Sequence, residues 1–120
     1  SYLGLRDQAI EFSDVLSINR YNGWYTESGD IAAGVAALSD ELDQIYAAYP
    51  RPLVLMEFGA DTIPGMHSEP PVMFSEEYQA EFLAAYLDLL KTRAYVVGEH
   101  IWNLCDFNAG QSTHRFGSLN

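Results

Sequence analysis

The chain has 120 residues, of which 48% are hydrophobic and 19% are charged, and its formal net charge is −11. This length and apolar content fit one globular domain with a modest core and exclude a disordered chain. With only 6 basic residues, the sequence also excludes a nucleic-acid-binding surface, which needs clustered Lys and Arg.

The first half of the chain predicts a strand followed by a helix. The segment "DVLSIN" at 14–19 is apolar and typical of a strand. After a turn-like stretch, Asp30 is a natural helix N-cap. Apolar residues then recur at intervals of four and three: Ile31, Val35, Leu38, Leu42, Ile45 and Tyr49. This spacing predicts a helix over 31–49, which Pro50 and Pro52 end.

The second half predicts a strand, a helix and a further strand. An apolar run at 53–56 predicts a short strand, and a long loop with three prolines follows it. Ser75 is expected to cap the next helix. The apolar face of that helix has five members: Tyr78, Phe82, Tyr86, Leu89 and Leu90. The segment "AYVVGEHIWN" at 94–103 predicts another buried strand.

This alternation of apolar strands and helices predicts an α/β fold with a parallel sheet covered by helices. Such a sheet is either open and doubly wound or part of a (β/α)8 barrel. No Gly-rich phosphate loop follows any predicted strand, which disfavours the nucleotide-binding open sheet. Polar and aromatic residues follow every strand instead, as at the active-site face of a barrel. The sequence therefore favours a partial TIM (β/α)8 barrel.

Three strands cannot close a barrel that needs eight. The sequence also lacks an initiator Met and ends on "FGSLN". We therefore expect residues 1–120 to be a single piece of a longer protein, without an internal domain boundary. Such a piece is expected to expose apolar surface that further strands would cover.

The apolar run at 53–56 ends on a carboxylate, Glu57. A buried carboxylate is costly to ionise unless charges or hydrogen bonds compensate. Aromatic rings beside Asn, Glu and Arg are typical of a sugar site. Retaining glycosidases need two carboxyl groups about 5–5.5 Å apart, one of them a nucleophile. Glu57, at the end of a rigid strand, suits that nucleophile, and pairing with an Arg at the rim is the alternative.

Four motifs in order resemble one family: "SINRYNGWY" (17–25), "MEFGADTIPGMHS" (56–68), "SEEYQAEFL" (75–83) and "VVGEHIWNLCDF" (97–107). They resemble the β-glucuronidases of glycoside hydrolase family 2, and the resemblance runs from about residue 14 to the end of the chain. It implies that the chain corresponds to the sixth to eighth strands of a (β/α)8 catalytic barrel.

The resemblance also implies a set of site residues. Glu57 would be the catalytic nucleophile, forming a covalent glucuronyl-enzyme. Tyr21 and Tyr25 would line the pocket with Asn19 beside them, and Tyr21 is expected to hydrogen-bond Glu57. Trp102 would form part of the sugar-binding wall.

Substrate selection and proton donation depend on further residues in this family. Arg115 and Asn120 fall where the family binds the glucuronate carboxylate. The Lys of the family's Asn-x-Lys motif is absent, because the chain stops at Asn120. The family's acid/base glutamate belongs to an Asn-Glu pair, and no such pair occurs here. We therefore expect the acid/base to precede Ser1.

The predicted activity is hydrolysis of β-D-glucuronides, with a small-molecule glucuronide or a glucuronate-containing glycan as the partner. Another family 2 activity, β-galactosidase or β-galacturonidase, is the alternative within the enzymes. A catalytically inactive sugar-binding protein on the same scaffold is the alternative outside them. We expect no cofactor, nucleic acid or membrane partner, and a homo-oligomeric full-length protein. A lone Cys105 excludes an internal disulfide and suits a reducing, cytoplasmic compartment.

The remaining polar residues are predicted to have structural roles. The three histidines, His67, His100 and His114, lack the HxH or HExxH spacing of a metal site. Asp61 follows Glu57 closely and is expected to brace its loop, and Glu99 is expected to have a structural hydrogen-bonded role. Cys105 is expected to pack in the interior. The solvated face of the second helix is predicted to carry Glu76, Glu77, Glu81 and Asp88.

Overall fold

Three parallel strands and two long helices alternate along the chain in the computed structural model, which describes residues 8–112 and 115–117. The elements are η2 (Gln8–Phe12), β1 (Leu16–Asn19), α1 (Ile31–Ala48), β2 (Leu53–Phe58), α2 (Glu76–Lys91) and β3 (Val96–Ile101). The sheet order is β1-β2-β3, and both strand pairs are parallel. The predicted parallel sheet is therefore confirmed.

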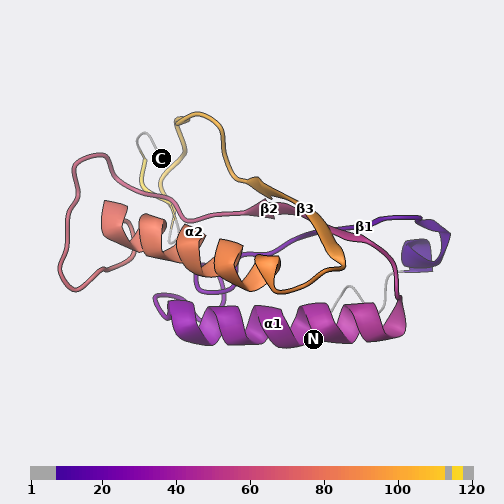
Figure 1. The fold of residues 1–120 in the computed structure, drawn as a ribbon. Helices are drawn as coiled ribbons and strands as arrows, with labels where there is room; N and C mark the ends of the chain where they lie inside the picture. The colour runs from indigo at the N-terminus through magenta and orange to yellow at the C-terminus, as the bar shows by residue number, and fades with distance from the viewer. Residues whose placement is uncertain (1–7, 113–114, 118–120) are drawn as a thin grey trace.

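Both helices lie on the same side of the sheet (Figure 1). Each begins at the predicted cap: the Asp30 carboxylate accepts a hydrogen bond from the Ala33 amide at 2.9 Å, and Ser75 Oγ accepts one from the Tyr78 amide at 3.2 Å. These caps satisfy amides that the first helical turn leaves without a partner. Helix α1 ends one residue earlier than predicted, because Tyr49 is its C-cap.

The core lies between the helices and the face of the sheet that they cover. Leu16 and Ile18 of β1 and Leu53 and Leu55 of β2 alternate with more exposed residues. Of the residues that the periodicity predicted, seven are buried: Leu38, Leu42, Ile45, Tyr78, Phe82, Tyr86 and Leu90. The other four, Ile31, Val35, Tyr49 and Leu89, are partly buried against this core. Each fully buried side chain contributes roughly 1.5–3 kcal/mol by leaving water. In the described ranges, neither helix is long and apolar enough to span a membrane.

Strand β3 is not buried as the sequence predicted. Val97 is 61% exposed, and Glu99 and His100 are exposed as well. The reason is that β3 is an edge strand, and in the described part of the chain the helices cover only one face of the sheet. Met56 on β2 is likewise 40% exposed. The expectation of uncovered apolar surface is met on this second face.

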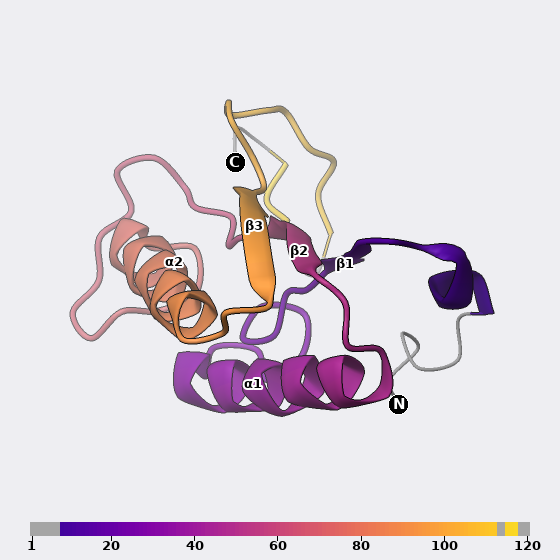
Figure 2. The same cartoon turned by 45° about the vertical axis from the view of Figure 1, so that its right-hand side comes forward.

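The segment after β3 also differs from its prediction. It turns back past the carboxyl-terminal ends of the strands, where it is drawn in yellow (Figure 2). Cys105 in this segment is exposed, so its predicted interior packing is wrong. Leu104 beside it is 97% exposed. The pattern misled because apolar residues after a strand do not reveal whether another layer covers them.

Candidate active site

A bulge in β2 determines where the Glu57 side chain lies. Ile18 of β1 pairs with Leu55, but the next residue, Asn19, pairs with Glu57, so β2 has one extra residue at this point. Such a bulge bends the strand and re-aims the side chains that follow it. Glu57, which is half-buried, and Asn19 consequently lie side by side at the carboxyl-terminal ends of their strands.

Tyr21 donates a hydrogen bond from its hydroxyl to Glu57 Oε2 at 2.7 Å. Burial, followed by this hydrogen bond, raises the pKa of the Tyr21 hydroxyl, which therefore stays protonated and remains a donor. The Tyr25 ring meets the Tyr21 ring edge-on, with 5.3 Å between the centroids. The contact expected between Tyr21 and Glu57 is present. In the described ranges no ion pair joins Glu57 to an arginine, the alternative left open by the sequence.

Two tyrosines of α2 hold the turn that carries Tyr21. Tyr78 donates its hydroxyl to the Gly23 carbonyl at 2.5 Å, and Tyr86 donates to the Asn22 carbonyl at 2.7 Å. The turn needs Gly23, whose φ of 93° is unfavourable for residues with a side chain. Because Tyr78 and Tyr86 are almost completely buried, these hydrogen bonds fix the turn from the core side.

An ion pair missed by the sequence reasoning fixes the same turn from α1. Arg20 donates from Nε and Nη2 to the two carboxylate oxygens of Glu41, at 2.7 Å and 2.5 Å. The Arg20 amide also donates to the Glu57 carbonyl at 2.9 Å. Glu41 is only 5% exposed, and a buried carboxylate requires such a partner. The Glu41 position, inside the apolar stripe of a helix, was the available signal.

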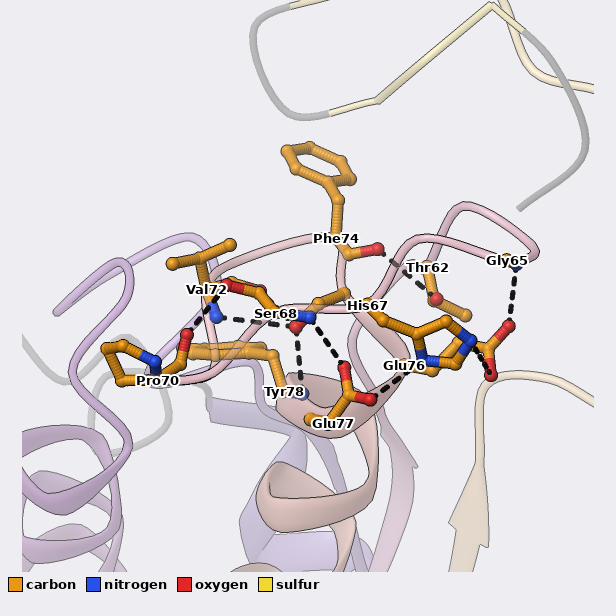
Figure 3. A network of polar contacts seen from close by, with 11 residues as sticks. Thr62, Gly65, His67, Ser68, Pro70, Val72, Phe74, Glu76, Glu77 and Tyr78 are labelled. Carbon is orange, nitrogen blue, oxygen red and sulfur yellow. Dashed lines mark hydrogen bonds and ion pairs between the residues drawn. The ribbon is translucent and has the colours of Figure 1, made fainter.

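The loop after β2 is tied to the first turn of α2 (Figure 3). Glu76 accepts from the Gly65 amide at 2.7 Å, and Glu77 accepts from the Ser68 amide at 3.0 Å. His67 Nδ1 lies 2.7 Å from the Glu77 carboxylate, which raises the pKa of the imidazole. Glu76 and Glu77 are therefore not merely solvated, as predicted, but hold this loop in place.

Trp102 follows β3 and lies against the end of β2. Its amide donates to the Phe58 carbonyl at 2.8 Å. A methyl group on Gly59 would lie 2.4 Å from the Trp102 carbonyl oxygen, so the two backbones touch. Next to this contact is a cavity of about 150 Å³ with a polar lining that includes Asp61, Asn103 and Asp106. The Trp102 side chain itself is 38% exposed.

Arg115 joins the segment after β3 to the Glu57 region. Its guanidinium lies 4.9 Å from the centroid of the Phe107 ring and 3.7 Å from Asp61 Oδ2. A hydrogen bond with Tyr25 is the largest cause of its raised pKa. The structure thus brings Asn19, Tyr21, Tyr25, Glu57, Trp102 and Arg115 to the carboxyl-terminal end of the sheet. The predicted site residue Asn120, and His114, lie outside the described residues.

A parallel sheet with helices on one side and polar side chains at its carboxyl-terminal end defines a segment of a TIM-barrel domain. The chain belongs to the glycosyl hydrolases family 2, TIM barrel domain, whose family model matches residues 4–119. Both the predicted fold class and the predicted family are confirmed.

Individual relatives are similar over nearly the whole chain. The β-glucuronidase of Sus scrofa is 40% identical over 112 residues, which are 92% of this chain and 17% of that protein. The structure of β-D-glucuronidase from Dictyoglomus thermophilum matches with a TM-score of 0.84 and 45% identity, covering 91% of this chain and 19% of that chain.

The β-glucuronidase of Bifidobacterium dentium, solved in complex with coumarin-3-O-glucuronide, matches with a TM-score of 0.80 and 40% identity. It covers 88% of this chain and 17% of that chain. The chain therefore spans less than a fifth of the length of each of these three relatives.

Proposed function

We propose that the chain supplies the nucleophile and part of the sugar pocket of a retaining β-glucuronidase. The observation that carries this proposal is the Glu57 carboxylate, which a bulge places at the end of β2 and which accepts the Tyr21 hydroxyl at 2.7 Å. A nucleophile must be held rigidly in the direction of attack, and a protonated phenol that donates a hydrogen bond to it fixes its orientation. The names of the relatives support the choice of a glucuronide.

In the proposed reaction, a Glu57 oxygen attacks the anomeric carbon while the bond to the leaving oxygen breaks. The leaving oxygen takes a proton from a general acid, and water then cleaves the glycosyl-Glu57 ester. The sequence contains no Asn-Glu pair. We therefore propose that the acid/base glutamate comes from outside residues 1–120.

The substrate carboxylate needs a cation, and Arg115 is suitably placed to supply it. Arg115 contacts Tyr25, whose ring packs on the Tyr21 ring. The other basic residues in the described ranges have partners elsewhere: Arg20 with Glu41, Arg51 with backbone carbonyls, Lys91 with Asp88 and Arg93 with Asp43. A planar guanidinium can bind a carboxylate through two hydrogen bonds.

The test is a substrate comparison with the full-length protein. We expect kcat/KM for an aryl β-glucuronide to exceed that for the matching β-galactoside and β-glucoside by at least about 100-fold, because these two sugars lack the carboxylate and leave the Arg115 donors without a ligand. The matching β-galacturonide keeps the carboxylate and differs at C4, so it tests the rest of the pocket and is expected to be a poorer substrate than the glucuronide. If the protein preferred the galactoside or the galacturonide, that sugar would be its substrate in place of the glucuronide. Sugar binding without hydrolysis would favour the inactive sugar-binding protein.

Tyr21→Phe in the full-length protein is expected to lower kcat by about 10- to 100-fold, with KM changed less. The substitution keeps the ring but removes the hydroxyl that orients Glu57, and a hydrogen bond to a charged group contributes roughly 1.5–3 kcal/mol. Steady-state kinetics on an aryl glucuronide measure the effect. Tyr95→Phe, which removes a hydroxyl bound to Asp43, is the matched control and should leave kcat unchanged. Trp102→Ala should mainly raise KM, because it removes a ring that would stack on the sugar. If Tyr21→Phe and Trp102→Ala changed kcat and KM to the same extent, the separate roles of Tyr21 in orienting Glu57 and of Trp102 in binding the sugar would be contradicted.

Two further expectations stay predictions. The full-length protein is expected to be a homo-oligomer, and its compartment is expected to be the cytoplasm. Size-exclusion chromatography with light scattering and cell fractionation would test them.

A further inference from the structure

Asp61 is a buried carboxylate whose charge is only partly compensated. Asp61 is 9% exposed, and its Oδ2 has no hydrogen-bond partner within the described ranges. The nearest cation is Arg115, whose Nε lies 3.7 Å from that oxygen, too far for a hydrogen bond. Burial raises the pKa of Asp61, and the Arg115 charge opposes the rise. A buried carboxylate in this state is costly, so a purely structural role explains it poorly.

Arg115 is held on several sides by the contacts already described. The Phe107 ring lies against the guanidinium plane, Tyr25 is hydrogen-bonded to it, and Asp61 faces its Nε edge. The Arg115 side chain is nevertheless 25% exposed. A guanidinium has five N–H donors, so these contacts leave donors for a ligand.

We propose that Asp61 is a positioning residue, which fixes the orientation of the Arg115 guanidinium so that its free donors face the anionic group of the substrate. This inference rests on the proposed function, because it takes Arg115 as the cation that receives the glucuronate carboxylate. Asp61 itself does not touch the substrate in this scheme. It acts through Arg115 alone.

The long distance between the Asp61 carboxylate and the Arg115 guanidinium suits a positioning role better than a short ion pair would. A short, two-point pair between Asp61 and Arg115 would occupy the donors and neutralise the cation. At 3.7 Å the attraction directs the guanidinium without taking its hydrogen bonds. Asp61 also belongs to the loop that begins just after Glu57, and Gln79 of α2 donates to the Ala60 carbonyl at 2.7 Å beside it. Glu57 and Asp61, which orients Arg115, are therefore positioned by the same stretch of backbone.

The first experiment replaces the charge and keeps the shape. Asp61→Asn in the full-length protein is expected to raise KM for an aryl β-glucuronide by about tenfold, with kcat changed by less than about twofold. Residual hydrolysis of the matching neutral β-glucoside should stay the same. Asp43→Asn is the matched control, because it also removes the carboxylate of an Asp–Arg pair, that with Arg93, and it should change neither constant.

A double-mutant cycle decides whether Asp61 acts through Arg115. If it does, Asp61→Asn raises KM about tenfold in the wild-type background and has almost no effect when Arg115→Gln is already present. An equal rise in both backgrounds would overturn the inference, and so would equal losses for the glucuronide and the glucoside. Asp61→Ser is measured in parallel. The cycle is evaluated with the Asp61 variant whose melting temperature equals that of the wild type.

The same measurements separate this inference from the proposed function. A wild-type protein that hydrolyses no glucuronide would refute the proposed function. A wild-type protein that hydrolyses glucuronides, with an Asp61→Asn variant of unchanged KM, would refute the positioning role alone.

Discussion

Glu57→Gln in the full-length protein is expected to lower kcat for an aryl β-glucuronide by at least about 10⁴-fold. Glutamine keeps the size of the side chain and can still meet the Tyr21 hydroxyl, but its amide oxygen is too weak a nucleophile to form the glycosyl ester. Glucuronide binding should change by less than about tenfold, since the pocket keeps its shape. Steady-state kinetics and calorimetric titration with the substrate measure the two effects separately.

Chemical rescue distinguishes a lost nucleophile from a damaged fold. Azide should restore part of the activity of Glu57→Ala or Glu57→Gly, because a small anion can enter the space that the side chain leaves and attack the anomeric carbon. Glu81→Gln is the matched control, since Glu81 is exposed on α2 and its substitution should leave kcat unchanged. Turnover close to that of the wild type in Glu57→Gln would remove Glu57 from the proposal.

Gly59→Ala is expected to lower kcat/KM by about 100-fold or more, although it adds only one methyl group. That methyl group would lie 2.4 Å from the Trp102 carbonyl oxygen, which is backbone and cannot rotate away. The ends of β2 and β3 must therefore separate, and the Phe58–Trp102 hydrogen bond of 2.8 Å must lengthen or break. A misplacement of about 1 Å at a catalytic site costs on the order of 10²-fold in rate.

Gly110→Ala is the matched control for this steric effect. An added methyl group at Gly110 would meet no atom within 4 Å, so kcat/KM and the melting temperature should both stay unchanged. A melting curve for Gly59→Ala shows whether the protein still folds. Normal kinetics in a folded Gly59→Ala variant would mean that Trp102 and Glu57 need not keep their present spacing.

The helices were predictable because local rules determine them. Asp30 and Ser75 cap their helices as expected, and the residues spaced at four and three, such as Leu38 and Leu42, are buried. Strand β3 shows where such rules fail. Its apolar residues predict burial, but exposure of Val97 depends on whether another layer covers that face, and a local pattern carries no information about a distant layer.

The candidate site also has features that the sequence predicts and features that it does not. The position of Glu57 after an apolar run was visible in the sequence, whereas the bulge that places it opposite Asn19 was not, because no glycine or other local signal marks the extra residue. The partners of Glu41 and Asp61 were also not predicted. Each carboxylate lies within 4 Å of an arginine from a segment distant in the sequence, Arg20 after β1 and Arg115 after β3, and residue spacing alone cannot identify such a pair.

Helix α2 makes contact with the segments on both sides of the nucleophile strand. At one side, Tyr78 and Tyr86 hold the turn that carries Tyr21, and at the other, Glu76 and Glu77 hold the loop that follows β2. Because both segments are hydrogen-bonded to the same helix, a displacement of α2 is expected to move the two sides of the pocket together and to keep their spacing across Glu57.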